Sequence, residues 1–262
     1  MILLFQSKIS RMLQHDNPLF TIITVVYNGE SHLEETIKSV LNQSYENYEY
    51  IIIDGGSSDG TLDIIERYAH AIDYWISEKD DGIYDAMNKG IKLASGKYTA
   101  FINADDYYSH DTLQAVADFL KNYPQTEFVY SDINVIDESG KMLFYWRGNA
   151  GNDQIGDFIP HPSCFISTAW LQDNHFDLKF EYAADYELIV RLIDQGIEKR
   201  YLHHTVAYYR AGGSSASFKS RLECFQINYH YFGLLYAIKI LSLDSIQKIL
   251  SSGKSLFSRL FA

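Results

Sequence analysis

Residues 98–106 read Tyr98-Thr99-Ala100-Phe101-Ile102-Asn103-Ala104-Asp105-Asp106 and give the clearest indication of the fold. Its first five residues are apolar or β-forming and follow Gly96-Lys97, a pattern typical of a short buried strand. The acidic residues therefore stand at the carboxyl end of a strand, where open α/β sheets bind their ligands. Buried carboxylates are costly without a cationic partner, and Mg²⁺ or Mn²⁺ suits them because hard cations take carboxylate oxygens. A polar loop in which Asp106 opens a turn is the alternative interpretation.

Outward from this stretch, strand patterns and helix patterns alternate along the chain. The expected strands are residues 20–26, 50–53, 74–76, 98–102 and 128–130. The apolar stripes at helical spacing between them are Leu33, Ile37, Val40 and Leu41; Leu62, Ile65 and Tyr68; Ile83, Met87, Ile91 and Ala94; and Leu113, Val116, Ala117 and Leu120. Repeated strand–helix units of this length predict an α/β fold with a doubly wound, mostly parallel sheet.

The pattern changes after residue 130. Residues 135–143 are expected to form a hairpin around a Gly turn, and residues 148–162 are polar and Gly-rich. A helical pattern over residues 184–195 ends before Gly196, a favourable residue just past a helix. Residues 199–209 are expected to form a pair of strands. This part of the chain is therefore predicted to be a smaller region of mixed structure.

Composition and charge narrow the functional classes. The 262 residues, 47% of them hydrophobic, suffice for one large domain, although length alone leaves two open. The net charge of −12 argues against a nucleic-acid partner, which needs a clustered basic face. A phosphorylated substrate stays open because a metal can neutralise it locally. The two cysteines, Cys164 and Cys224, suggest no disulfide framework and favour a reduced, cytosolic setting.

The C-terminal tail leaves a question about membranes. No run approaches the ~20 apolar residues that a membrane helix needs, and Met1–Phe5 is too short for a secretory signal. The nearest run, residues 229–243, is interrupted by Lys239, and a packed helix is the preferred interpretation. The alternative is a helix on a membrane surface. Its basic anchors would be Lys239, Lys248, Lys254 and Arg259. The sequence predicts a cytoplasmic protein, with peripheral contact at the inner face of the membrane left open.

Polar side chains gather at the ends of the expected strands. Those that follow successive strands are Tyr27 and Asn28; Asp54; Asp80, Asp81 and Asp85; and Asn103, Asp105 and Asp106. Because the carboxyl ends of parallel strands share one edge of a sheet, these side chains are expected to converge. Their convergence predicts a site for a metal and a nucleotide diphosphate. For Tyr27, a place in the core is the alternative.

Five strings carry a resemblance to a known family. They are Thr24-Val25-Val26-Tyr27-Asn28, Ser39-Val40-Leu41-Asn42-Gln43-Ser44, Ile53-Asp54-Gly55-Gly56-Ser57-Ser58-Asp59-Gly60-Thr61, Asp81-Gly82-Ile83-Tyr84-Asp85-Ala86-Met87-Asn88-Lys89-Gly90 and Asn103-Ala104-Asp105-Asp106. As an ordered set, the chain resembles the family-two inverting glycosyltransferases over roughly residues 20 to 210. The resemblance implies the nucleotide-sugar-binding fold called GT-A. The fourth string is similar to that of bacterial enzymes that build capsule, exopolysaccharide or O-antigen repeats.

On the donor side, the resemblance implies a role for each matched residue. Tyr27 and Asp54 would line the nucleoside pocket. Asp81 and Asn88 would lie near the ribose or the diphosphate. The Asn103-Ala104-Asp105 segment occupies the place of the family's Asp-X-Asp motif.

The same resemblance places the metal and the catalytic base. Asp105 would hold Mn²⁺ or Mg²⁺, with Asn103 and Asp106 beside the donor. Asp185 in Ala183-Ala184-Asp185-Tyr186 would be the catalytic base, at the start of its helix. His161 would lie on the acceptor side.

Four positions depart from the family pattern. Asn103 replaces the first acid of Asp-X-Asp, and Gly55 replaces an acid used in base recognition, which leaves uracil, guanine and thymine donors open. No histidine follows Tyr209-Arg210, where relatives carry a further metal ligand. Ala184 replaces the glutamate that precedes the base in relatives.

The resemblance implies a metal-dependent inverting glycosyltransferase of surface polysaccharide synthesis. The donor would be a nucleotide-diphosphate sugar and the acceptor a saccharide or lipid-linked saccharide. The expected parts are an N-terminal extension (1–19), a nucleotide-sugar-binding half (20–130), an acceptor-binding and catalytic-base half (131–215) and a C-terminal helical tail (216–262). A non-catalytic relative that binds a nucleotide sugar is one alternative. A nucleotidyltransferase is another, disfavoured because residues 26–29 are not a Gly-rich basic loop.

Overall fold

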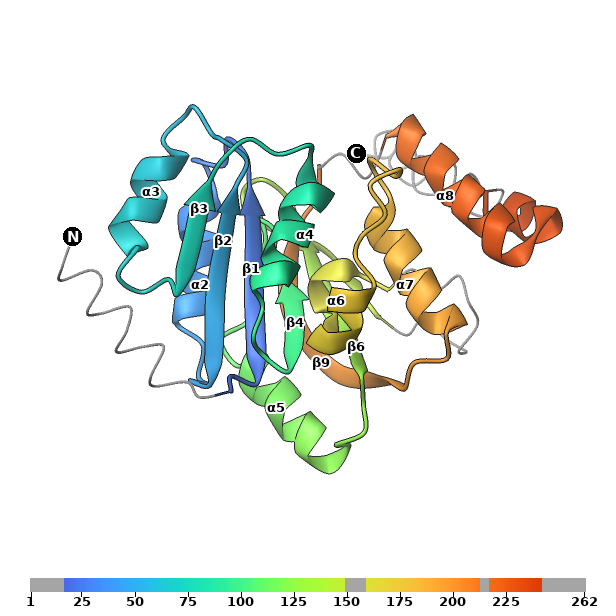
Figure 1. Cartoon of the computed structure of the whole chain (residues 1–262), viewed down its shortest axis with the longest axis horizontal. Helices are drawn as coiled ribbons and strands as arrows, with labels where there is room; N and C mark the ends of the chain where they lie inside the picture. The colour runs from blue at the N-terminus through green and yellow to red at the C-terminus, as the bar shows by residue number, and fades with distance from the viewer. Residues whose placement is uncertain (1–16, 149–158, 213–216, 242–262) are drawn as a thin grey trace, which may run out of the picture. The chain divides into compact units, whose positions relative to one another are not determined.

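The computed structural model describes residues 17–148, 159–212 and 217–241. The chain divides into two compact units, residues 1–213 and residues 214–262. The predicted N-terminal extension lies outside the described residues, apart from its last three positions. The first unit contains the sheet and every predicted site residue (Figure 1).

Within the described residues, nine strands form one sheet. They are β1 (Phe20–Val26), β2 (Tyr48–Asp54), β3 (Tyr74–Ser77), β4 (Tyr98–Phe101), β5 (Tyr107–Tyr108), β6 (Phe128–Ile136), β7 (Met142–Trp146), β8 (Phe165–Ser167) and β9 (Lys199–Arg210). Their order is β3-β2-β1-β4-β8-β6-β9-β5, and β7 pairs with β6 off this path.

The helices of the first unit connect and cover these strands. They are α2 (Leu33–Leu41), α3 (Thr61–Tyr68), α4 (Ile83–Leu93), α5 (Thr112–Asn122), the 3-10 turn η1 (His161–Ser163), α6 (Thr168–Asp173) and α7 (Ala184–Asp194). Side chains of α2, α3 and α5 join one face of the sheet in a single core. Figure 1 shows α4 in front of β1 and β4, on the opposite face. The predicted α/β fold with a doubly wound sheet is confirmed.

The two halves of the sheet differ in strand direction. Strands β3, β2, β1 and β4 are parallel to one another, as expected from strand–helix–strand connections. Strand β8 then runs antiparallel to both β4 and β6, whereas β6 and β9 are parallel to each other. The sheet is thus parallel over β3, β2, β1 and β4, and mixed beyond them, where β5 also pairs antiparallel with β9.

Several elements differ from those predicted. Residues 199–210 form one strand, not a pair, because β9 follows β6 through register shifts instead of turning back. Strand β6 crosses residue 130, so the sheet is continuous across the predicted boundary between the two halves. Strands β5 and β8 have two and three residues, too few for a periodic pattern to reveal them.

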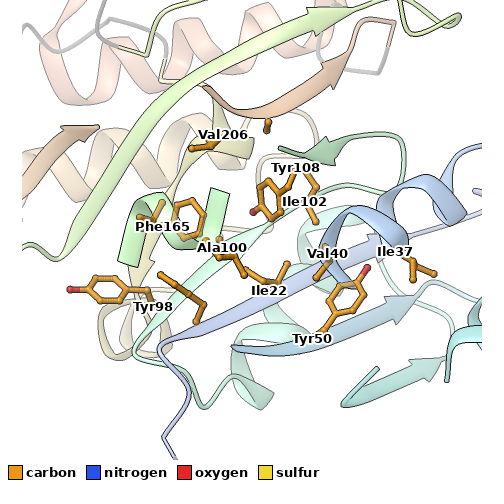
Figure 2. Close-up of a cluster of buried hydrophobic side chains, with 14 of the residues drawn as sticks. Ile22, Ile37, Val40, Tyr50, Tyr98, Ala100, Ile102, Tyr108, Phe165 and Val206 are labelled. Carbon is orange, nitrogen blue, oxygen red and sulfur yellow. The ribbon is translucent and has the colours of Figure 1, made fainter. Parts of the chain in front are cut away.

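The core forms where alternate strand residues meet the helices. Figure 2 shows Ile22 of β1 and Tyr50 of β2 next to Val40 of α2, and Ala100 of β4 and Ile37 of α2 belong to the same buried cluster. The helical stripes predicted these contacts, with one exception. Ile83 was expected to point inward, but this first residue of α4 is 41% exposed.

The second unit is helical where it is described. Helix α8 (Phe218–Phe232) begins after Ser217, whose hydroxyl accepts a hydrogen bond from the Ser220 amide at 3.1 Å. It ends at Gly233, whose φ of +81° suits glycine, and residues 234–241 are helical again. Residues 242–262, with the predicted anchors Lys248, Lys254 and Arg259, lie outside the described residues. None of the helices in the described ranges is long and apolar enough to span a bilayer.

Candidate functional site

The loops after β1 and β2 lie together at one edge of the sheet. Val26 pairs with Asp54 at the ends of the two strands, and the Gly55 amide donates to the Val26 carbonyl at 2.9 Å. The side chain of Asn28 accepts from the Ser58 amide at 2.9 Å. Tyr27 projects from this junction with 66% of its surface exposed, so the alternative of a core residue is wrong. An exposed aromatic ring at the end of a central strand is suited to stacking on a flat ligand.

Asp54 is fully buried, and its carboxylate accepts hydrogen bonds from neighbouring donors. Its Oδ2 accepts from the amides of Gly56 (3.1 Å) and Ser57 (3.0 Å) and from the hydroxyl of Ser77 (2.5 Å). Its Oδ1 accepts from the Ser57 hydroxyl at 2.5 Å. Four donors compensate the burial of the carboxylate, which is otherwise costly. Asp54 therefore shapes the loop after β2, and its predicted contact with the nucleoside stays a prediction.

The acidic loop after β4 contains a buried carboxyl with one unsatisfied oxygen. Asp106 is 1% exposed, its Oδ1 accepts from the Arg210 amide at 2.8 Å, and its Oδ2 has no hydrogen-bond partner. Burial and the neighbouring Asp105 raise the pKa of Asp106 well above its usual range. Thr36 of α2 holds the loop in place, because its hydroxyl donates to the Asp106 carbonyl at 2.6 Å.

Asp105 lies at the more open side of the same loop. Burial raises the pKa of Asp105, and nearby His32 and Arg210 partly oppose this shift. Asn103, two residues earlier, has a buried Oδ1 without a hydrogen-bond partner. The Asp105 carboxylate and the unpartnered amide oxygen of Asn103 are oxygen ligands of the kind that Mg²⁺ and Mn²⁺ prefer.

These residues fit a cation that is shared with a ligand rather than one enclosed by protein. Among the described residues, no group of three or more His, Cys, Asp or Glu side chains is arranged to hold a metal. Mg²⁺ commonly binds through one or two carboxylates and completes its shell with waters and substrate phosphates. The loop after β4, with Asp105 as its one outward carboxylate, has this composition.

Arg210, at the end of β9, holds the acidic loop to two other segments. Its Nε donates to the Asp105 carbonyl at 3.1 Å, and its Nη1 donates to the carbonyls of Asp137 (3.1 Å) and Glu138 (3.0 Å). Its Nη2 donates to Glu35 of α2 at 2.8 Å. The sequence predicted no role for Arg210 and used it only to locate the position at which relatives carry a histidine. An arginine as the last residue of a long strand was the sequence feature that could have indicated this role.

A second cluster surrounds Asp185 near the start of α7. Its Oδ1 accepts from the Tyr84 hydroxyl and from the Tyr186 amide, each at 2.9 Å. Tyr84 comes from α4, 101 positions earlier, and belongs to the Asp81–Gly90 string. The fold thus joins the predicted base to a residue for which the sequence suggested no role.

His161 lies in this second cluster. Its ring stacks on Phe101 with centroids 5.3 Å apart and meets the edge of Phe176 at 5.9 Å. Its Nε2 is buried without a hydrogen-bond partner. Burial lowers the pKa of His161, and the nearby Asp185 opposes this shift, so the ring is neutral at pH 7. Phe101 is the last residue of β4, so the ring contact joins the base cluster to the strand that leads into the acidic loop.

The remaining two predicted donor residues differ in their surroundings. Asn88 is buried in α4, where its amide group donates to the Phe176 carbonyl at 3.0 Å and accepts from the Phe176 amide at 2.9 Å. Both ends of this side chain are therefore occupied by backbone, which gives Asn88 a structural role. Asp81 is exposed at the turn before α4. Their predicted contacts with the ribose or diphosphate stay predictions.

Comparison with known proteins identifies relatives by sequence. The family model described as Glycosyl transferase family 2 matches residues 21–176. A PGL/p-HBAD biosynthesis glycosyltransferase of Mycobacterium bovis is 30% identical over 204 residues, which cover 75% of this chain and 78% of the relative. The putative teichuronic acid biosynthesis glycosyltransferase TuaG of Bacillus subtilis is 39% identical over 107 residues, which cover 39% of this chain and 42% of TuaG.

Solved structures with low sequence identity share the fold. Residues 1–349 of S. aureus TarS, in complex with UDP-GlcNAc, match with a TM-score of 0.62 and 18% identity, covering 81% of this chain and 65% of that fragment. The mannosyltransferase PcManGT from Pyrobaculum calidifontis, in complex with GDP-Man and Mn²⁺, matches with a TM-score of 0.59 and 15% identity, covering 97% and 88%. Together with the family match over more than half of its length, these findings show that the chain belongs to glycosyl transferase family 2 and is a glycosyltransferase with a GT-A-like fold.

Proposed function

We propose that this protein is a metal-dependent inverting glycosyltransferase that acts in surface polysaccharide synthesis. It moves a sugar from a nucleotide-diphosphate sugar to a saccharide or lipid-linked saccharide. The observation that carries the proposal is the Asp185 carboxylate, held by Tyr84 in a cluster separate from the Asp105 loop. One carboxylate thus serves the leaving group, and another serves the attacking hydroxyl.

On the donor side, Tyr27 stacks on the nucleobase and Asp105 faces the diphosphate. The exposed ring of Tyr27 and the buried, donor-saturated Asp54 loop beside it support this placement. A divalent cation bound by Asp105 would stabilise the negative charge that develops on the departing diphosphate. Arg210 keeps the Asp105 loop in place through its backbone carbonyl.

On the acceptor side, Asp185 takes the proton from the attacking hydroxyl. Inverting transfer is a direct displacement at the anomeric carbon, so the hydroxyl must lose its proton as it attacks. A positioned base of this kind typically contributes on the order of 10²–10⁴ in rate. Neutral, buried His161 borders the cluster and contributes an apolar wall together with Phe176.

The test replaces Asp185 by Asn, which keeps the shape of the side chain but cannot accept the proton. We expect kcat, measured by release of nucleoside diphosphate, to fall by at least roughly 100-fold while donor affinity changes little. Asp194→Asn, the same change on an exposed residue at the far end of α7, is the matched control and keeps full activity. Near-normal turnover of Asp185→Asn would falsify the proposed role.

The donor is identified by binding rather than by turnover. A ligand that binds only the folded state raises its apparent stability, so UDP-, GDP- and dTDP-sugars are compared by thermal shift with and without Mn²⁺. We expect one nucleotide class to stabilise the protein, and more so with Mn²⁺. Asp105→Ala should remove the Mn²⁺-dependent part. Equal stabilisation of this variant and the wild type would contradict the metal assignment.

The proposal includes a cytoplasmic location with peripheral contact to the membrane through the C-terminal tail. Exposed apolar side chains on the helical residues 234–241 support it. They are Leu234, Leu235, Ile238 and Leu241. The test is co-sedimentation with anionic liposomes of the full chain and of a variant carrying Leu234→Ser, Leu235→Ser and Ile238→Ser. Equal partitioning of both proteins would remove the membrane contact from the proposal.

A further inference from the structure

We propose that Tyr84 is a positioning residue for the base, a role that rests on the proposed function of Asp185. Its hydroxyl fixes one carboxylate oxygen, Oδ1, and so presents the other, Oδ2, as the oxygen that accepts the proton of the attacking hydroxyl. Tyr84 lies within the Asp81–Gly90 string, yet neither the string nor the donor site accounts for it.

The hydrogen bonds distinguish the two oxygens of Asp185. The Tyr84 hydroxyl and the Tyr186 amide both donate to Oδ1, each at 2.9 Å, and neither donates to Oδ2. Two donors from different directions restrict rotation of the carboxylate about its Cβ–Cγ bond. A base whose orientation is set before the substrate arrives loses less entropy in the reaction.

Tyr84 is itself held rigidly. It is buried, and its ring stacks on Phe176 with centroids 5.5 Å apart and planes at 28°. Phe176 is in turn fixed by Asn88, whose amide group makes two hydrogen bonds to the Phe176 backbone. Tyr84 and Asn88 lie one turn apart on α4, so a single helix fixes both the aromatic support and the hydroxyl. The donor to Asp185 therefore has little freedom to leave.

Helix capping does not explain the position of Asp185. The N-cap of α7 is Ala183, not Asp185. The backbone amide that donates to the Asp185 side chain is that of the next residue, Tyr186, whereas a capping side chain binds the amides two or three positions further on. The long-range bond to Tyr84 is thus the principal restraint on this carboxylate.

The groups around Asp185 decide how a pH profile is interpreted. Tyr84 faces it from α4, and His161 and Cys164 lie near it in the segment around η1. Burial lowers the pKa of His161 and raises the pKa of the Cys164 thiol, so both are neutral near pH 7. A change in the acidic limb of activity that depends on the Tyr84 hydroxyl therefore reports on Asp185.

The experiment is Tyr84→Phe, which keeps the ring and its stacking on Phe176 and removes only the hydroxyl. We expect kcat at pH 7 to fall about tenfold or more, because a hydrogen bond to a charged group is lost and the carboxylate can rotate. The acidic limb of the kcat/KM profile for the acceptor should move to higher pH, since the charged carboxylate loses a donor. Incorporation of 3-fluorotyrosine at position 84, a stronger donor, should move that limb to lower pH.

Tyr98→Phe is the matched control. Tyr98 is also buried, and its hydroxyl donates to the Thr126 carbonyl at 2.6 Å, away from the site. Tyr98→Phe should lower Tm without moving the acidic limb of the pH profile. Wild-type kcat and an unmoved limb in Tyr84→Phe, or a loss of Tm and kcat together with an unmoved limb, would overturn the positioning role. Either result would leave the proposed function intact if Asp185→Asn is inactive, whereas an active Asp185→Asn would overturn the function itself.

Discussion

Replacing Arg210 by Met is expected to destabilise the domain far more than removing its ionic partner. Arg210 is 4% exposed, and its guanidinium donates to three backbone carbonyls, those of Asp105, Asp137 and Glu138, as well as to Glu35. Met has a similar length but no donors. The amide of residue 210 still donates to Asp106, so the variant isolates the guanidinium.

The size of the effect follows from burial. A hydrogen bond from a charged group contributes about 1.5–3 kcal/mol, and breaking a buried ionic network by removing one partner costs about 3–5 kcal/mol because contributions overlap. We therefore expect Arg210→Met to lower the free energy of unfolding by about 3–5 kcal/mol. The Glu35 side chain is 52% exposed, so Glu35→Gln should cost no more than about 1 kcal/mol.

Urea unfolding, followed by tryptophan fluorescence and far-UV circular dichroism, measures both free energies. Arg210→Lys should lie between the two, because one ammonium group cannot reach four acceptors on three segments. If Arg210→Met lost less than about 1 kcal/mol, or if Glu35→Gln lost as much as Arg210→Met, the backbone carbonyls would not be the partners that matter and the reasoning would be refuted.

Three further predictions concern other residues. Asn88→Asp keeps the acceptor for the Phe176 amide but turns a carboxylate oxygen toward the Phe176 carbonyl. The free energy of unfolding should therefore fall by about 2 kcal/mol or more, while affinity for the nucleotide sugar is retained. Weakened binding of the nucleotide sugar at unchanged stability would instead support a direct contact with it. Burial lowers the pKa of His161 in the folded state, so the folded protein loses stability relative to the unfolded chain as the pH falls below the unfolded pKa of about 6.5, and no such loss occurs above it. His161→Gln should therefore show a smaller loss of Tm between pH 7.5 and 5 than the wild type. An identical loss would contradict the burial argument. A Cβ at Gly96 would lie 2.5 Å from the Phe20 and Thr21 backbone, whereas a Cβ at Gly55 would meet only the movable carboxylate of Asp80. Gly96→Ala should therefore lower Tm by more than Gly55→Ala. Equal shifts in a thermal melt would count against the close approach of β4 to β1.

Local patterns in the sequence were sufficient to predict the parallel part of the sheet and the helices that connect its strands. Strands β1 to β4 and helices α2, α4 and α5 lie where hydrophobic periodicity placed them, because each is long enough to show its period. The acidic residues after β4 could be located for the same reason, since the end of a parallel strand is itself a position at the sheet edge. The hairpin at Gly140 also followed from local turn chemistry, as its φ of +81° shows.

Only the tertiary structure determined how the polar residues are shared between the site and its support. Asp54 and Asn88 are predicted donor contacts, and the structure adds that neighbouring groups hydrogen-bond their side chains. Arg210 joins Glu35 across 175 positions, and Tyr84 joins Asp185 across 101. Hydrogen bonds between such distant residues leave no periodic trace along the chain, because they depend on where whole strands and helices pack and not on the residues beside them. Local sequence patterns were enough to place these chemical groups at the sheet edge, whereas the packing of α4 and β9 set the contacts of Asp185 and of the Asp105 loop.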